Sequence, residues 1–424
     1  MHDCQACTEF NTLSRRKFMA LSGLTGAAAI AMPAWVPRVS FARSHISGRD
    51  VMVSIYLRGG ADGLTLCAPF GDPAYRSLRP TLAIGAPDAA INPATNLDGY
   101  FGLPPAMASL LEPYQAGKLL IIHATGSTDS SRSHFDAQRF MEVGKPRDPT
   151  LFTGWLGRHI VSANPADNTA PVRAIGIGYQ LQTQLQGGYK TLPVPDMTRY
   201  GISGPSATRP ARLNYLNGIY GGVLDPVRSA ALNTYTTVTL LNNIGFSGYV
   251  PQGGAVYAAN SGFQQQLRTT AALIKADVGV EAVAIDKGGW DTHSAQGNFG
   301  NAGLAAVMSD VAAGLLAFFR DVISQGHNAT VVVMSEFGRT AAENASFGTD
   351  HGHGNAMFAM GNHIAGGRVL TQWPTLSNLY GNQDLQVTID YRDILAEIVQ
   401  NRLSNLNLST VFPSYNPVFR GVTN

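Results

Sequence analysis

Cysteine is almost absent from this chain, whose 424 residues contain three. Cys4 and Cys7 form a C-x-x-C pair, a spacing that can indicate zinc binding or redox chemistry. Both precede a cleavage site that we predict below, so Cys67 would be the one cysteine left. A lone cysteine excludes a disulfide within the remaining chain and a metal site built from several thiolates.

An excess of either charge is also lacking. The chain has 30 Lys and Arg residues against 28 Asp and Glu residues, and charged residues make up 14% of its length. Proteins that bind nucleic acid or anionic membranes through their charge carry a basic excess. Nucleic acid is therefore not an expected partner.

The first 42 residues have the pattern of a twin-arginine export signal. Arg15 and Arg16 directly precede an apolar stretch, Met19–Trp35, and a small-x-small cleavage pattern ends at Ala42. The apolar stretch is shorter than the about 20 residues that cross a bilayer, so a membrane anchor is the less favoured alternative. We expect the twin-arginine machinery to export residues 43–424 to the periplasm or the medium, with no membrane span left after cleavage.

Short apolar runs alternate with helical patterns through residues 43–424. The runs that we expect to form strands are 51–57, 119–124, 172–177, 281–286, 330–334 and 356–360. Apolar residues three and four apart predict helices at 104–116, 133–143, 264–276, 302–323 and 391–406. Nearly continuous apolar strands suit the covered interior of a parallel sheet, so the alternation predicts an α/β sandwich with a mostly parallel sheet.

The segment from about 180 to 262 has a different composition. It is rich in Gly, Asn, Tyr, Gln and Pro, and 227–242 is its one candidate helix. We interpret it as an irregular cap insertion over one end of the sheet, within a single domain over 43–424. A disordered linker is the alternative.

Ionisable residues follow the expected strands directly. In open parallel sheets, ligands bind beyond the carboxyl ends of the strands. Carboxylates and imidazoles that meet there from distant segments suit divalent ions such as zinc, manganese or calcium. The candidate metal ligands are Asp62, Asp291, His293, Glu336, His351 and His353. His123 and His134 are interpreted as structural or supporting residues.

Two further residues are candidate catalytic groups. Arg339 can offer a planar guanidinium to the oxygens of a phosphoryl or sulfuryl group. Ser133 stands at the start of an expected helix, where it is a candidate nucleophile. Asp136 follows three residues later in a capping pattern, so a helix cap is the alternative for Ser133. Glu336 and Arg339 have a local alternative too, as an ion pair at a helix start.

Several segments together resemble the DUF1501 family of secreted bacterial proteins. Beside the export signal they are 57–64, 132–138, 289–293, 335–340 and 350–354, so that the resemblance extends over almost all of 43–424. That family is similar to the alkaline phosphatase and sulfatase superfamily. The resemblance implies an alkaline-phosphatase-like three-layer α/β/α fold and a two-metal hydrolase site.

The resemblance also implies a role for each site residue. Asp62 matches the aspartate ligand after the first strand, and Ser133 matches the nucleophile, with Ser131 as runner-up. Asp291 and His293 match an Asp and a His that share one metal. The final histidine ligand matches His351 or His353.

One position departs from the superfamily pattern. Glu336 stands where the superfamily has an Asp followed by a His, and Phe337 replaces that histidine. One ligand is then missing unless the second histidine compensates, which leaves the number of ions open. The expected function is an exported metal-dependent hydrolase of small-molecule phosphate or sulfate esters. The alternative is a non-catalytic envelope protein that keeps the fold for binding.

Overall fold

A computed structural model describes residues 49–165, 170–202 and 204–424. The predicted export signal, residues 1–42, lies outside the described residues, so its cleavage stays a prediction. The element boundaries below refer to the described part of the chain.

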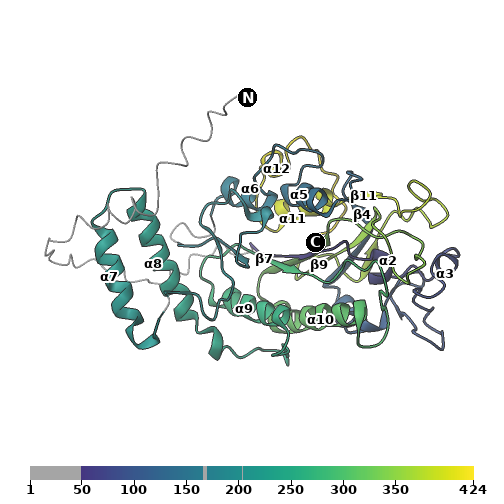
Figure 1. Ribbon diagram of the computed structural model, residues 1–424, viewed down its shortest axis with the longest axis horizontal. Coiled ribbons are helices and arrows are strands. Elements are labelled where there is room, and N and C mark those ends of the chain that lie inside the picture. The colour runs from purple at the N-terminus through teal and green to yellow at the C-terminus, as the bar shows by residue number, and fades with distance from the viewer. Residues whose placement is uncertain (1–48, 166–169, 203) are drawn as a thin grey trace, which may run out of the picture. The chain divides into compact units, whose positions relative to one another are not determined.

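A mostly parallel sheet lies between two layers of helices (Figure 1). Its nine described strands run in the order β10 (Arg368–Leu370), β4 (Leu119–Gly126), β9 (Asn355–Gly361), β8 (Ala329–Ser335), β1 (Val51–Leu57), β7 (Ala282–Lys287), β5 (Ala174–Ile177) and β6 (Thr191–Pro193), with β11 (Ile389–Asp390) also paired to β4. Strand β9 is antiparallel to β4 and β8. The other described pairings in this sheet are parallel, which confirms the predicted mixed α/β class.

Alternate side chains of the strands enter two separate cores. In β1, Val53 and Ile55 belong to one core, whereas Met52 and Tyr56 belong to the other. This alternation follows from the two-residue repeat of a strand, and both faces are apolar because both are covered.

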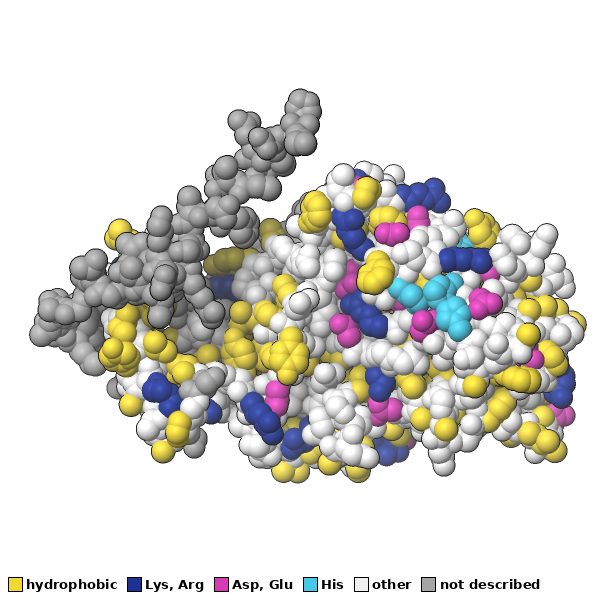
Figure 2. Space-filling model, viewed as in Figure 1, with side chains coloured by type: hydrophobic (Ala, Val, Ile, Leu, Met, Phe, Trp, Pro, Cys, Tyr) yellow, Lys and Arg dark blue, Asp and Glu magenta, His cyan; other side chains and the backbone are white. Residues whose placement is uncertain are grey.

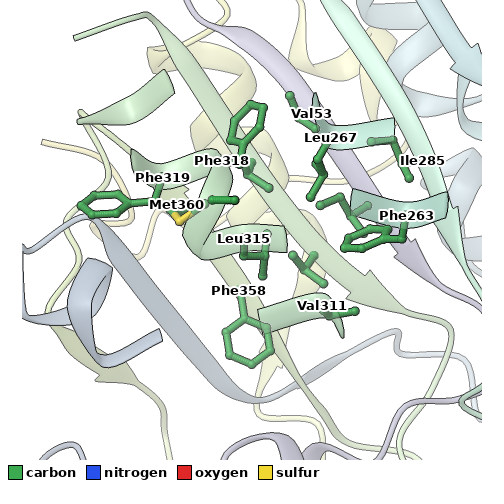
Figure 3. Packing of buried hydrophobic residues seen from close by; sticks show 14 of the residues in the cluster. Val53, Phe263, Leu267, Ile285, Val311, Leu315, Phe318, Phe319, Phe358 and Met360 are labelled. Carbon is green, nitrogen blue, oxygen red and sulfur yellow. The ribbon is translucent and has the colours of Figure 1, made fainter. Parts of the chain in front are cut away.

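Different helices cover the two faces. The first core is closed by η2 (Pro105–Leu110), α4 (Leu111–Gln115), α9 (Gly262–Ala276), α10 (Gly303–Phe318) and the π-helical turn η6 (Phe319–Ile323). The second is closed by α5 (His134–Val143), α6 (Trp155–Ser162), α11 (Tyr391–Asn401) and α12 (Leu408–Val411). Figure 3 shows Phe263 and Leu267 of α9 with Val311 and Leu315 of α10 against Val53 and Ile285 of the sheet.

The segment Gly303–Ile323 is long and apolar enough to cross a membrane, with a mean hydropathy of 1.5 over its best window. Leu304, Met308 and Val311 within it are buried against the sheet. A core helix of a soluble domain passes the same test of length and hydropathy, so this helix carries no evidence of a membrane span.

Two predicted helices have other boundaries in the structure, and local residues explain both differences. The expected helix 104–116 divides into η2 and α4 because Pro113 has no N–H to continue an α-helical ladder. Restarting the helix at Leu111 places Pro113 in a first turn, where no N–H is needed. The helix expected over 391–406 ends at Asn401, and the chain then turns through Ser404, whose φ is 53°.

The segment from about 180 to 262 contains more regular structure than its composition indicates. Helices α7 (Arg209–Gly221) and α8 (Val227–Ile244) pack against each other, and β6 is an edge strand of the main sheet. The helix expected at 227–242 is confirmed by α8. The role of the segment as a cap stays a prediction.

Candidate metal centre

Histidine side chains gather on one face of the protein, with acidic and basic side chains around them (Figure 2). The residues come from segments that follow β4, β7 and β8 and from the segment that leads into β9. Because β9 is antiparallel to its neighbours, its beginning lies at the same edge as the ends of β4 and β8. The topology thus places four distant segments together.

Three imidazole nitrogens converge on the carboxylate of Asp291. Its Oδ1 atom lies 3.1 Å from Nε2 of His293 and 3.3 Å from Nε2 of His351. Its Oδ2 atom lies 3.5 Å from Nε2 of His134. One ligand atom each from His134, Asp291 and His351 fits within a span of 4.8 Å. This is the one group of three or more His, Cys, Asp or Glu residues with metal-binding geometry in the described part of the chain.

Each of the three imidazole rings is oriented by an oxygen atom at its Nδ1. The acceptors are Glu336 Oε1 at 2.8 Å from His134, Asp350 Oδ1 at 2.9 Å from His293, and the backbone oxygen of Arg132 at 2.8 Å from His351. An acceptor at Nδ1 keeps the hydrogen there and leaves the Nε2 lone pair of a neutral ring free for a metal.

The centre of the arrangement is rich in lone pairs. The Nε2 atoms of His293 and His351 are 2.9 Å apart, beside a carboxylate oxygen of Asp291. Two lone pairs and a carboxylate repel one another at this distance unless a proton or a metal ion lies between them. In addition, Nε2 of His134 is buried and has no hydrogen-bond partner among the described residues. Imidazole and carboxylate ligands suit zinc and other first-row divalent ions, so these residues fit such an ion.

Arg339 holds the Asp291 carboxylate in place. Its Nη2 lies 2.7 Å from Asp291 Oδ1 and 2.9 Å from the backbone oxygen of Trp290, and its Nε donates to Gly60 O at 2.6 Å. Partial burial raises the pKa of Asp291, but the hydrogen bond and charge of Arg339 outweigh it and bring that pKa to about 2. The guanidinium is fully buried, a position that does not favour the predicted contact between Arg339 and a substrate.

Glu336 lies behind His134 rather than at the point where the Nε2 atoms converge. Besides His134 it accepts hydrogen bonds from the backbone N–H of Gly59 at 2.8 Å and from Nε2 of Gln138 at 2.9 Å. The Phe337 ring lies 5.0 Å from the His134 ring and 4.8 Å from the His351 ring. In this geometry Glu336 orients an imidazole, and Phe337 packs against two of the rings, which themselves lie 4.3 Å apart.

Asp62 is placed in a different polar cluster. Its Oδ2 atom accepts hydrogen bonds from Arg79 at 2.6 Å, Thr65 at 2.6 Å and Gln296 at 2.8 Å. Burial raises the pKa of Asp62, but the charge and hydrogen bond of Arg79 outweigh it and lower that pKa. Among the described residues, none of its hydrogen bonds reaches the imidazole cluster.

Ser133 caps helix α5. Its Oγ accepts the backbone N–H of Asp136 at 3.4 Å, and its own N–H donates to Oγ of Ser131 at 3.2 Å. The side chain of Ser133 is exposed and directly precedes His134 in the chain. The helix cap is thus confirmed, and the role as nucleophile stays a prediction.

Two more histidines lie apart from the three imidazoles. His353 faces the ring of Tyr380 at 4.8 Å, and burial lowers its pKa. His123 is buried with Nε2 at 2.9 Å from the backbone oxygen of Cys67, and burial lowers its pKa to about 4. His123 therefore has the structural role that the sequence indicates.

His134 is the member of the cluster that sequence reasoning missed. The sequence indicates a structural or supporting role for His134. One signal was available: His134 and Gln138 are four residues apart, hence on one face of α5, and both contact Glu336. That contact is visible only in three dimensions, since about 200 residues separate Glu336 from α5.

Comparison with known proteins supports the resemblance seen in the sequence. No curated protein matches this chain. Residues 252–413 match the model of a family described as "Protein of unknown function (DUF1501)". The matched range contains Asp291, His293 and His351, whereas His134 precedes it. The match supports the resemblance to the DUF1501 family over this part of the chain.

Proposed function

We propose that this protein is a metal-dependent hydrolase of phosphate or sulfate esters. The observation that carries the proposal is the convergence of three Nε2 atoms on the Asp291 carboxylate. The mostly parallel sheet with helices on both faces supports an alkaline-phosphatase-like arrangement, the fold that the sequence resemblance implies.

The ion would be held by His134, His293, His351 and Asp291. Three imidazoles favour zinc over calcium, which prefers a shell of oxygen atoms. A divalent ion in this position supplies Lewis acidity toward an ester oxygen and offsets developing negative charge. Glu336, Asp350 and the Arg132 carbonyl keep the three rings in their binding orientation, and Arg339 keeps Asp291 ionised and fixed.

Ser133 is the proposed nucleophile. It is exposed at the start of α5 and directly precedes His134 in the chain. The N-terminus of a helix carries a partial positive charge, which stabilises an anion such as a phosphoryl or sulfuryl group at this position. Arg15 and Arg16, with the cleavage pattern at Ala42, support export of the enzyme to the periplasm or the medium.

One observation favours a second candidate, a non-catalytic envelope protein that binds a metal. Asp62, Glu336 and Arg339, expected to contact an ion or a substrate, are all buried and hydrogen-bonded to protein groups. The ligands that remain suffice for one metal ion. They do not provide a second ion to hold the ester group from its other side. Tight metal binding without turnover would identify this alternative.

Metal analysis and activity assays decide between the two. We expect purified protein to contain about one zinc or manganese ion per chain and to cleave members of a panel of phosphate and sulfate monoesters. Chelation should abolish cleavage, and readdition of the ion should restore it. Protein that neither retains nor binds a divalent ion would overturn both candidates. An ion without cleavage of any ester would overturn the hydrolase.

A further inference from the structure

A groove of about 350 Å³ opens along helix α5, beside the candidate metal centre. One wall carries side chains of α5, and the other carries residues from two loops. The lining residues include Phe135, Gln138, Arg139, Phe152, Thr183 and Gln186.

The groove and the metal centre share α5. Its first residue, His134, belongs to the imidazole cluster, and the next, Phe135, is at the groove. Phe135, Gln138 and Arg139 are spaced three and four residues apart, so they share one face of the helix. Gln138 donates to Glu336 Oε1, the atom that also accepts from Nδ1 of His134. Gln138 therefore connects a molecule in the groove to Glu336, the residue that orients His134.

The groove displays two phenyl rings to solvent. Phe135 is 89% exposed and Phe152 is 73% exposed. The guanidinium of Arg139 lies 5.1 Å from the centre of the Phe152 ring and donates to the backbone oxygen of Leu151 at 3.2 Å, which holds this loop. Large apolar rings left uncovered at a concave surface are typical of ligand contacts.

Two polar residues of the lining are uncommitted. The side chains of Thr183 and Gln186 make no hydrogen bond within the described part of the chain, so both are free to pair with a ligand. At the floor, Glu142 is held by both terminal nitrogens of Arg58 at 2.8 and 2.9 Å. Arg58 also pairs with Asp286 at 2.8 Å, and Arg139 adds a positive charge to the lining.

We propose that the groove binds a sugar ring. Phenyl faces pack against the C–H faces of a pyranose, and amide and hydroxyl groups pair with its hydroxyls. An acyl chain would leave Thr183 and Gln186 without partners, whereas the hydroxyls of a sugar ring can pair with both. Combined with the proposed function, on which this last step rests, the substrate is a carbohydrate phosphate or sulfate ester.

Binding can be tested without turnover. The Asp291→Asn variant removes the central carboxylate but leaves the groove, and saturation-transfer NMR can follow its binding of glucose, N-acetylglucosamine and cellobiose. We expect ring protons of at least one sugar to receive saturation. Phe152→Ala and Gln186→Ala should each weaken that binding by about fivefold to tenfold. Tyr215→Ala is the matched control, because Tyr215 on α7 is 71% exposed and does not line the groove.

Kinetics with the otherwise unaltered protein complete the test. Phe152→Ala should raise KM for glucose 6-phosphate by about fivefold to tenfold and leave KM for ethyl phosphate unchanged. Sugar binding by Asp291→Asn without ester cleavage by any form of the protein supports the groove and overturns the hydrolase. Ester cleavage that is insensitive to Phe152→Ala, with no sugar binding, overturns the groove assignment and leaves the hydrolase standing. Binding of adenosine but of no sugar also overturns the assignment.

Discussion

The Nε2 atom of His293 lies 2.9 Å from the Nε2 atom of His351. The two residues are 58 positions apart in the chain, yet each ring has an oxygen acceptor at Nδ1 and directs Nε2 toward the Asp291 carboxylate. A proton on one Nε2 atom, or a bound metal ion, relieves the repulsion between the two lone pairs at this distance.

Removal of one imidazole should weaken metal binding, whereas removal of a nearby histidine should not. We expect His351→Ala to lower zinc affinity by about a hundredfold or more, since the loss of a direct ligand exceeds the 10- to 100-fold cost of a lost supporting residue. His353→Ala is a matched control two positions away, because His353 contacts Tyr380 instead. Titration with a competing chelator measures both. Equal losses in the two variants would show that the cluster is not the binding site.

The carboxylate behind His134 should matter for the metal as well. Glu336→Gln removes its charge but keeps its size, so we expect about a 10- to 100-fold loss in zinc affinity with a smaller change in stability. Glu336→Ala also leaves the buried N–H of Gly59 unpaired, at about 1–3 kcal/mol, whereas the half-buried amide of Gln138 can turn to water. Chelator competition and urea unfolding separate the two effects. Unchanged affinity in Glu336→Gln would contradict the orienting role.

Asp62 should contribute to stability more than to the metal. Arg79 and Asp62 are an ion pair without solvent exposure, so we expect Asp62→Asn to lower the free energy of unfolding by about 3–5 kcal/mol. The variant should still bind close to one ion per folded chain. Loss of the ion with unchanged stability would restore Asp62 to the ligand set that the sequence indicates.

The two roles of Ser133 can be separated by choice of substitution. Ser133→Ala removes both the hydroxyl and the cap, so it should abolish ester cleavage and cost about 1 kcal/mol of stability. Ser133→Asn replaces the cap with an equally good one and should recover the stability but not the activity. Thermal unfolding and the ester assay provide the two measurements. Activity in Ser133→Asn would remove the serine from the proposed mechanism.

Stability should fall in mild acid because of two buried histidines away from the metal centre. Burial lowers the pKa of His159 to about 3 and that of His123 to about 4, against an ordinary value of 6.5. Below pH 6.5 the two histidines therefore bind protons in the unfolded chain but remain neutral in the folded chain. This contribution to stability is complete above pH 6.5 and is lost as pH falls toward 4.

The size of the acid effect follows from proton linkage. Each histidine adds a slope of up to about 1.4 kcal/mol per pH unit to the free energy of unfolding between pH 6 and 4. Urea unfolding at several pH values measures the slope, and His159→Gln should reduce it. The exposed His363, changed in the same way, is the control. A slope unchanged by His159→Gln would show that this ring is not the source.

Local pattern was sufficient to locate most strands. The β-branched runs at 51–57 and 330–334 are found as β1 and β8, because an apolar strand covered on both faces needs little beyond its own composition. The helix predicted at 104–116 divides between Leu110 and Leu111, because Pro113 has no N–H to continue the α-helical ladder. The apolar pattern thus predicts that a strand or helix exists better than it predicts where that strand or helix begins and ends.

The sequence by itself determined the chemistry of the site, namely carboxylates and imidazoles at strand ends, and its six candidate ligands include Asp291, His293 and His351. Tertiary structure decided how the other candidates are used. Glu336 accepts from Gly59 and His134, and Asp62 pairs with Arg79, through contacts between distant parts of the chain. A side chain is a ligand or a support according to what occupies its other atoms, and only the folded chain brings those partners within hydrogen-bonding distance.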